Sequence, residues 1–171
     1  SQVLGLAFHP EKPMRLLAAT AADGVYRSND GGQVWVQSNI GLGTDRIHAV
    51  AFAPNNPEVV YLTTHLGIYR SDDGGSTWEP RSNGLGYQFV HAIAIDPRDS
   101  DIAYVGTASE LHTLHPTHKQ EGLHRGEGIY KTLDGGRTWV LSDAGIEEDN
   151  LVVMTPHPRL PFELWTGAAA G

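Results

Sequence analysis

Short runs of alternating apolar and small or polar residues recur along the chain. In one stretch, "HAVAFA" (48–53), "EVVYLTT" (58–64), "GIYRS" (67–71) and "STWEPRS" (76–82) follow one another, with a Pro-Asn-Asn-Pro turn after the first and a Gly-Gly turn before the last. A period of two and β-branched or aromatic residues predict strands, and Pro and Gly predict turns. No window longer than ten residues has helical periodicity. The pattern therefore predicts an antiparallel meander of four short strands.

The same meander recurs at a nearly constant interval. Its starting motif reads "LGLAFHP" (4–10), "HAVAFAP" (48–54), "HAIAIDP" (91–97) and "VVMTPHP" (152–158), and the prolines that end these motifs are 44, 43 and 61 residues apart. The longer interval contains an insertion of 18 residues, "ELHTLHPTHKQEGLHRGE" (110–127). Four-stranded units of this length are typical of β-propeller blades.

The predicted fold is therefore all-β: a partial β-propeller of four-stranded antiparallel blades, with three complete blades and the first half of a fourth. The expected boundaries are 1–43 for blade 1, 44–86 for blade 2, 87–147 for blade 3 with its insertion, and 148–171 for the half blade. An uncovered sheet edge invites pairing with another chain. We therefore expect further propeller blades, from the same or another chain, to be partners.

A second motif occurs once in each complete unit, as "SNDGGQVW" (28–35), "SDDGGSTW" (71–78) and "TLDGGRTW" (132–139). It falls between the third and fourth predicted strands, where an aspartate can accept backbone N–H bonds and glycines supply positive φ. An active site does not recur once per blade, so we expect a structural role, with each tryptophan burying its ring. The structural residues are Ser28, Asp30, Gly32, Trp35, Ser71, Asp73, Gly75, Trp78, Thr132, Asp134, Gly136 and Trp139. A calcium site at Asp72 and Asp73 is the alternative, but the spaced oxygen ligands of an EF-hand loop are missing.

The pattern Ser/Thr-x-Asp-x-Gly-x-Thr-Trp resembles the Asp-box, or BNR, repeat of sialidases, xyloglucanases, sortilin-type receptors and photosystem II assembly factors. Three copies at blade spacing cover residues 1–147, and the first copy departs from the motif by having Val34 in place of Thr. The resemblance implies a propeller, permits glycoside hydrolase activity, and implies an extracytoplasmic or secreted location.

Composition narrows the classes of partner. The chain of 171 residues, 40% of them hydrophobic, has 20 Asp and Glu against 12 Lys and Arg, a formal charge of -8, and no cysteine. Without a basic run, nucleic acid is not expected as a partner. No apolar run is long enough to span a membrane, and no cofactor is predicted. Arg27, Arg70 and Lys131 recur at one strand position and are predicted to lie on a solvated blade face rather than in a substrate clamp.

The variable loops are predicted to share one end of the blades, because alternate connections of a meander lie at opposite ends. This end would carry the links between blades, the loops between second and third strands, and the insertion 110–127, and irregular loops on a rigid scaffold are the usual place for binding groups. The candidate ligand-binding residues are His48, His65, Tyr87, His91, Asp45 and Glu147. The alternative for His48 and His91 is packing at the mouth of the channel. Stacking on a sugar is an option for Tyr87 and Phe89, against packing between blades.

The favoured function is a non-catalytic propeller segment that binds a protein or carbohydrate ligand through these loops. A glycoside hydrolase of the xyloglucanase or sialidase type is the alternative. The Phe/Tyr-Arg-Ile-Pro segment expected of a sialidase is absent from the sequence. A xyloglucanase-like enzyme needs two acids about 5–10 Å apart, and the spacing of Asp45, Glu147, Glu148 and Asp149 singles out no pair.

The insertion also suggests a metal site. His112, His115 and His118 recur at every third residue in "HTLHPTH", and two of them, with His91 or His65, could bind a divalent transition metal. Pro116 interrupts any helix that would align them, so a hydrated loop or a pH-sensitive contact surface is the alternative.

Overall fold

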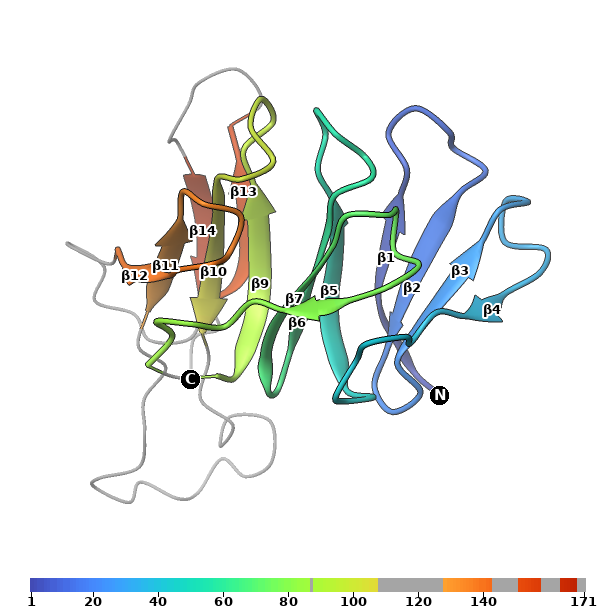
Figure 1. Ribbon diagram of the computed structural model, residues 1–171, viewed down its shortest axis with the longest axis horizontal. Coiled ribbons are helices and arrows are strands. Elements are labelled where there is room, and N and C mark those ends of the chain that lie inside the picture. Colours follow the sequence, from blue (N-terminus) through green and yellow to red (C-terminus); the bar gives the residue numbers. More distant parts are fainter. Residues whose placement is uncertain (87, 108–127, 143–150, 158–163, 169–171) are drawn as a thin grey trace.

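The computed structural model describes residues 1–86, 88–107, 128–142, 151–157 and 164–168. Within them the chain is all-β and contains no helix, and the strands form three four-stranded antiparallel sheets and a two-stranded sheet, arranged side by side in chain order (Figure 1). The sheets are blade 1 (β1 Val3–Phe8, β2 Leu16–Thr20, β3 Val25–Ser28, β4 Val36–Gln37), blade 2 (β5 Ile47–Phe52, β6 Val60–Thr64, β7 Gly67–Ser71, β8 Glu79–Pro80), blade 3 (β9 Val90–Ile95, β10 Ala103–Thr107, β11 Ile129–Thr132, β12 Val140–Leu141) and the half blade (β13 Leu151–Pro156, β14 Leu164–Ala168). The predicted fold class is confirmed.

The outermost strand of each blade is shorter than the sequence predicts. The predicted strand 76–82 contains only β8, two residues long. The backbone N–H groups of Ser76 and Thr77 donate to Asp73 Oδ1 at 2.9 Å each, so this part of the chain belongs to the turn. Pro80 has no N–H to donate to a strand ladder.

The Asp-box turns are closed by their own polar side chains. Asp73 Oδ1 also accepts the Ser71 hydroxyl at 2.7 Å, and Asp73 Oδ2 accepts the Thr77 hydroxyl at 2.7 Å. Partial burial acts to raise the pKa of Asp73, but these bonds outweigh it and hold that pKa below its ordinary value. In blade 3, bonds from the hydroxyl and N–H of Thr138 lower the pKa of Asp134 to about 2.

Blades pack through apolar residues of neighbouring sheets. Leu17 of blade 1 lies in one buried cluster with Ile47 and Val50 of blade 2, and Tyr61 of blade 2 lies in a second cluster with Val90 of blade 3. The joint also needs a glycine. Gly75 has φ +86°, and a Cβ there would lie 2.8 Å from Leu17 Cδ1.

The two ends of the blades carry different loops. The N–H groups of Gly31, Gly74 and Gly135, one in each Asp-box, donate to the turn between the first and second strands of the same blade, at Met14 O, Glu58 O and Asp101 O. Both connections therefore lie at one end, which we call the Asp-box end. The opposite end carries the links between blades and the loops between second and third strands, and we call it the insertion end.

Candidate functional site

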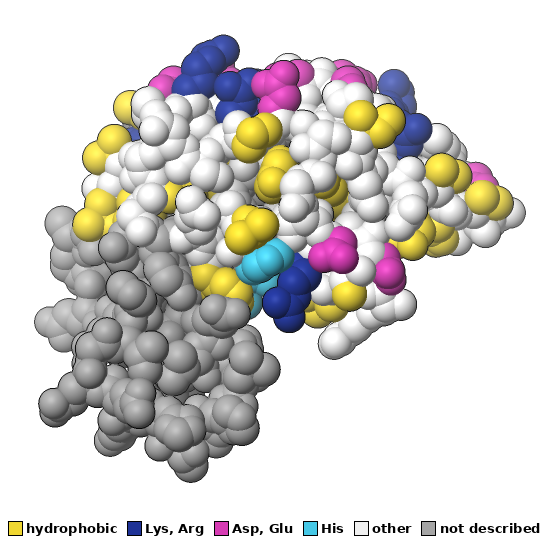
Figure 2. Space-filling view, turned by 60° about the horizontal axis from the view of Figure 1, so that its bottom comes forward, with side chains coloured by type: hydrophobic (Ala, Val, Ile, Leu, Met, Phe, Trp, Pro, Cys, Tyr) yellow, Lys and Arg dark blue, Asp and Glu magenta, His cyan; other side chains and the backbone are white. Residues whose placement is uncertain are grey.

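Two histidines and a phenylalanine meet where the innermost strands of blades 2 and 3 begin. His48 on β5 and His91 on β9 stack with ring centroids 4.3 Å apart and an interplanar angle of 19°. The Phe89 ring lies 4.9 Å from the His48 ring and 4.8 Å from the His91 ring. All three side chains are partly exposed. We call His48, Phe89 and His91 the histidine cluster; Figure 2 shows histidine side chains on this face beside hydrophobic, basic and acidic ones.

Hydrogen bonding defines the protonation of the cluster. His48 Nδ1 lies 2.8 Å from Val90 O, and because a carbonyl can only accept, Nδ1 carries the proton and Nε2 keeps its lone pair. His91 Nε2 is buried and has no hydrogen-bond partner in the described part of the chain.

The surroundings keep both imidazoles neutral. Burial, followed by the nearby His48, lowers the pKa of His91 to about 4. Burial also lowers the pKa of His48, although the bond to Val90 O opposes it. At neutral pH the cluster is therefore an uncharged aromatic surface.

Polar residues of the link between blades 1 and 2 surround the cluster. The Thr44 hydroxyl lies 3.2 Å from His65 Nδ1 and accepts the Arg46 N–H at 3.2 Å. His65 and Arg46 both act electrostatically on His48, so they lie near it. Asp45 is exposed in the same link, and its carbonyl accepts the Gly24 N–H at 2.8 Å.

The structure thus gathers His48, His65, His91 and Asp45 at the insertion end. Tyr87, Glu147 and the three insertion histidines His112, His115 and His118 lie outside the described residues. Sequence reasoning considered Phe89 only as a stacking residue and overlooked Thr44. The signal for the cluster was present, since His48 and His91 occupy equivalent positions 43 residues apart.

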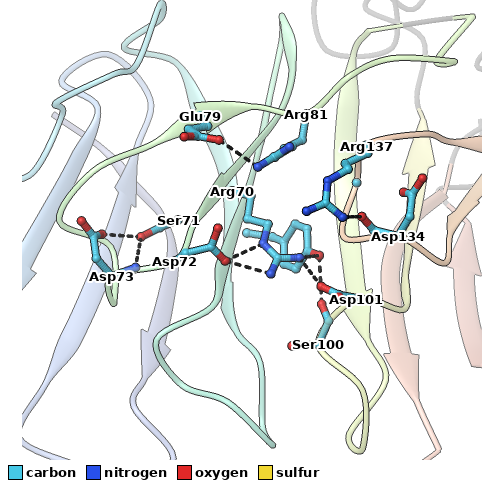
Figure 3. Close-up of polar contacts among 12 residues, drawn as sticks. Arg70, Ser71, Asp72, Asp73, Glu79, Arg81, Ser100, Asp101, Asp134 and Arg137 are labelled. Atoms are coloured by element: carbon cyan, nitrogen blue, oxygen red, sulfur yellow. Dashed lines mark hydrogen bonds and ion pairs between the residues drawn. The ribbon is translucent and has the colours of Figure 1, made fainter.

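At the Asp-box end, Arg70 corrects one expectation. It was predicted to lie on a solvated face, but its side chain is only 12% exposed and lies between blades 2 and 3 (Figure 3). Its guanidinium donates to Asp72 Oδ1 at 2.8 Å, to Asp101 Oδ1 at 2.6 Å and to the Tyr61 hydroxyl at 2.9 Å. Arg70 is thus saturated by protein groups and ties the blades together.

Within the described residues, no helix is both long and apolar enough to cross a membrane. No sequence among the curated proteins matches the chain. Solved structures resemble it in fold. An ancestral GH74 enzyme matches with a TM-score of 0.70 and 20% identity, over 91% of this chain and 20% of that one.

Two further structures agree. The GH74 xyloglucanase from Xanthomonas campestris has a TM-score of 0.62 and 17% identity, over 87% of this chain and 24% of that one. YCF48, solved bound to a D1 peptide, has a TM-score of 0.57 and 16% identity, over 98% of this chain and 46% of that one. The chain thus spans less than half the length of each of these proteins.

A family model described as "Sortilin, neurotensin receptor 3" matches residues 23–150, which include the Asp-boxes of all three complete blades. The protein belongs to the Sortilin-Vps10 family.

Proposed function

We propose that this propeller segment is a non-catalytic binding module that holds a protein or glycan ligand through its insertion end. The observation that carries the proposal is the histidine cluster, a neutral aromatic surface at the ends of two rigid strands. Aromatic faces stack on sugar rings and on apolar side chains, and Arg46 and Asp45 add exposed polar groups beside them.

The cluster suits binding better than acid–base chemistry. A general acid or base works best with a pKa near the operating pH, whereas His91 has a pKa of about 4. Hydrolysis of a glycoside needs two carboxyl groups about 5–10 Å apart. Of the four acids singled out at this end, only Asp45 lies in the described residues. The fold likeness to GH74 enzymes keeps a hydrolase segment as the second candidate.

The first experiment is a screen of the labelled chain on glycan and peptide arrays. We expect binding to one class of array, lost in Phe89→Ala and retained in Arg98→Ala, a matched change at an exposed residue of the Asp-box end. Binding that survives Phe89→Ala and His48→Ala would contradict the proposal. Release of reducing sugar from a bound glycan would instead support the hydrolase.

A further inference from the structure

The joint between consecutive blades occurs twice, with the same hydrogen bonds. The indole N–H of Trp78 in blade 2 donates to Ser38 O of blade 1 at 2.7 Å, and the Trp78 backbone N–H donates to Ile40 O at 2.9 Å. In blade 3, the indole N–H of Trp139 donates to Arg81 O of blade 2 at 2.7 Å. Each Asp-box tryptophan therefore binds the carbonyl that directly follows the outermost strand of the preceding blade.

The innermost strands make the apolar half of the same joint. Ile47 and Val50 of β5 are 0% and 9% exposed, because they pack on blade 1. Val90 and Ile95 of β9 are 0% and 4% exposed against blade 2. Apolar side chains at these positions are thus buried wherever a preceding blade is present.

Blade 1 presents the same surface uncovered. Val3, Leu6 and Phe8 of β1, which correspond to Ile47, Val50 and Phe52, are 57%, 51% and 60% exposed. Trp35 is 37% exposed, against 3% for Trp78 and 2% for Trp139. No described residue accepts a hydrogen bond from its indole N–H. We call Val3, Leu6, Phe8 and Trp35 the blade 1 face. A contiguous apolar surface of this kind marks an interaction site.

We propose that the blade 1 face binds a further Asp-box blade, whose outermost strand is followed by carbonyls that accept the N–H groups of Trp35 as Ser38 and Ile40 accept those of Trp78. This inference is independent of the ligand proposed for the insertion end. The occupant is defined by the two internal joints, which show an apolar sheet over the inner strand and a carbonyl beside the indole.

The outer half of blade 3 shows what such a blade presents. An open pocket of about 330 Å³ there is lined by Leu133, Val140, Leu141 and Ser142, among others. Ser142 follows β12 as Ser38 follows β4, and the two backbone N–H groups make equivalent bonds, Ser142 to Ile129 O and Ser38 to Val25 O. An outer blade edge thus offers an apolar pocket with a carbonyl next to it, which fits an indole ring.

The test adds a blade of known surface. Residues 1–44 are duplicated in front of the full chain, so that the added blade offers to blade 1 the surface that blade 1 offers to blade 2. The protein is labelled with 5-fluorotryptophan, resonances are assigned by Trp→Phe variants, and solvent exposure is read from the fluorine shift between H2O and D2O. Trp35 of the original chain is expected to lose most of its solvent shift and to match Trp78 and Trp139.

Three results would overturn the proposal. The first is a folded tandem protein in which the original Trp35 keeps the solvent shift of the 171-residue chain. The second is an added blade that stays unfolded, because docking on the blade 1 face should order it. The third is protection of Trp35 in the 171-residue chain alone, appearing together with concentration-dependent dimers, since the occupant would then be a second copy.

A second measurement separates docking from general stabilisation. Trp35→Ala in the original blade should lower the melting temperature of the tandem protein by several times the decrease that it causes in the 171-residue chain. Leu17→Arg in the added blade, at the residue that packs on the next blade, should restore the solvent shift of Trp35. Equal effects of Trp35→Ala in both proteins would also overturn the proposal.

Discussion

Replacing Asp73 with alanine removes the acceptor that closes the Asp-box turn of blade 2. Its carboxylate accepts four hydrogen bonds, from the Ser71 hydroxyl, the N–H groups of Ser76 and Thr77, and the Thr77 hydroxyl, at 2.7–2.9 Å. Water can replace part of this pairing because the loop is exposed on the side of Ser76 and Thr77. We therefore expect a loss of about 1–3 kcal/mol in the free energy of unfolding, rather than the full sum of four bonds.

Equilibrium unfolding in urea measures this loss. With a slope of about 2 kcal/mol per M, the midpoint should fall by about 0.5–1.5 M. Asp72→Ala is the matched control, because the neighbouring carboxylate is exposed, pairs with Arg70 and should contribute at most about 1 kcal/mol. Ligand binding at the insertion end should be unchanged in both variants. An Asp73→Ala protein that unfolds with the parent but loses ligand binding would refute the structural role of the Asp-box.

Three further changes test other contacts. Val34→Thr supplies the hydroxyl that Asp30 lacks, and should raise the free energy of unfolding in urea by about 0.5–1.5 kcal/mol; no change would mean that this hydroxyl adds nothing. Trp78→Ala should cost about 3–5 kcal/mol in the same assay, whereas Trp35→Ala should cost less than half as much, because that ring is 37% exposed in place of 3%. The His91 ring should titrate near pH 4 by NMR, and since its pKa lies below the ordinary 6.5, its stabilising effect should be complete above pH 6.5 and be lost as pH falls toward 4; an observed pKa of 6 or more would contradict its burial.

Much of the fold could be predicted because every blade repeats the same local solution. The third strand of blade 2 was predicted as "GIYRS", and β7 has the same bounds, Gly67–Ser71. The turn after it requires an aspartate and glycines, so its sequence is recognisable in each copy. The fourth strand was predicted too long, because side-chain acceptors take over bonds that a strand ladder would otherwise make.

Contacts between blades could not be predicted from local sequence. Trp35 and Trp78 end nearly identical motifs, yet one ring is partly exposed and the other is buried, because burial depends on the preceding blade. Arg70 resembles a surface residue in sequence, but Asp101, 31 residues away, pairs with it across the joint. The stacking of His48 on His91 likewise depends on the alignment of two sheets, which periodicity alone does not specify.

The most direct test of the proposed function is a histidine-selective NMR titration with the oligosaccharide or peptide that binds most strongly on the arrays. The rings of His48 and His91 lie in the candidate site, whereas His9 is buried at the Asp-box end and accepts the N–H groups of Glu11 and Lys12. We expect the His48 and His91 resonances to shift in proportion to occupancy while the His9 resonance stays fixed. Shifts confined to His9, or saturable binding that moves neither cluster resonance, would contradict ligand binding at the insertion end.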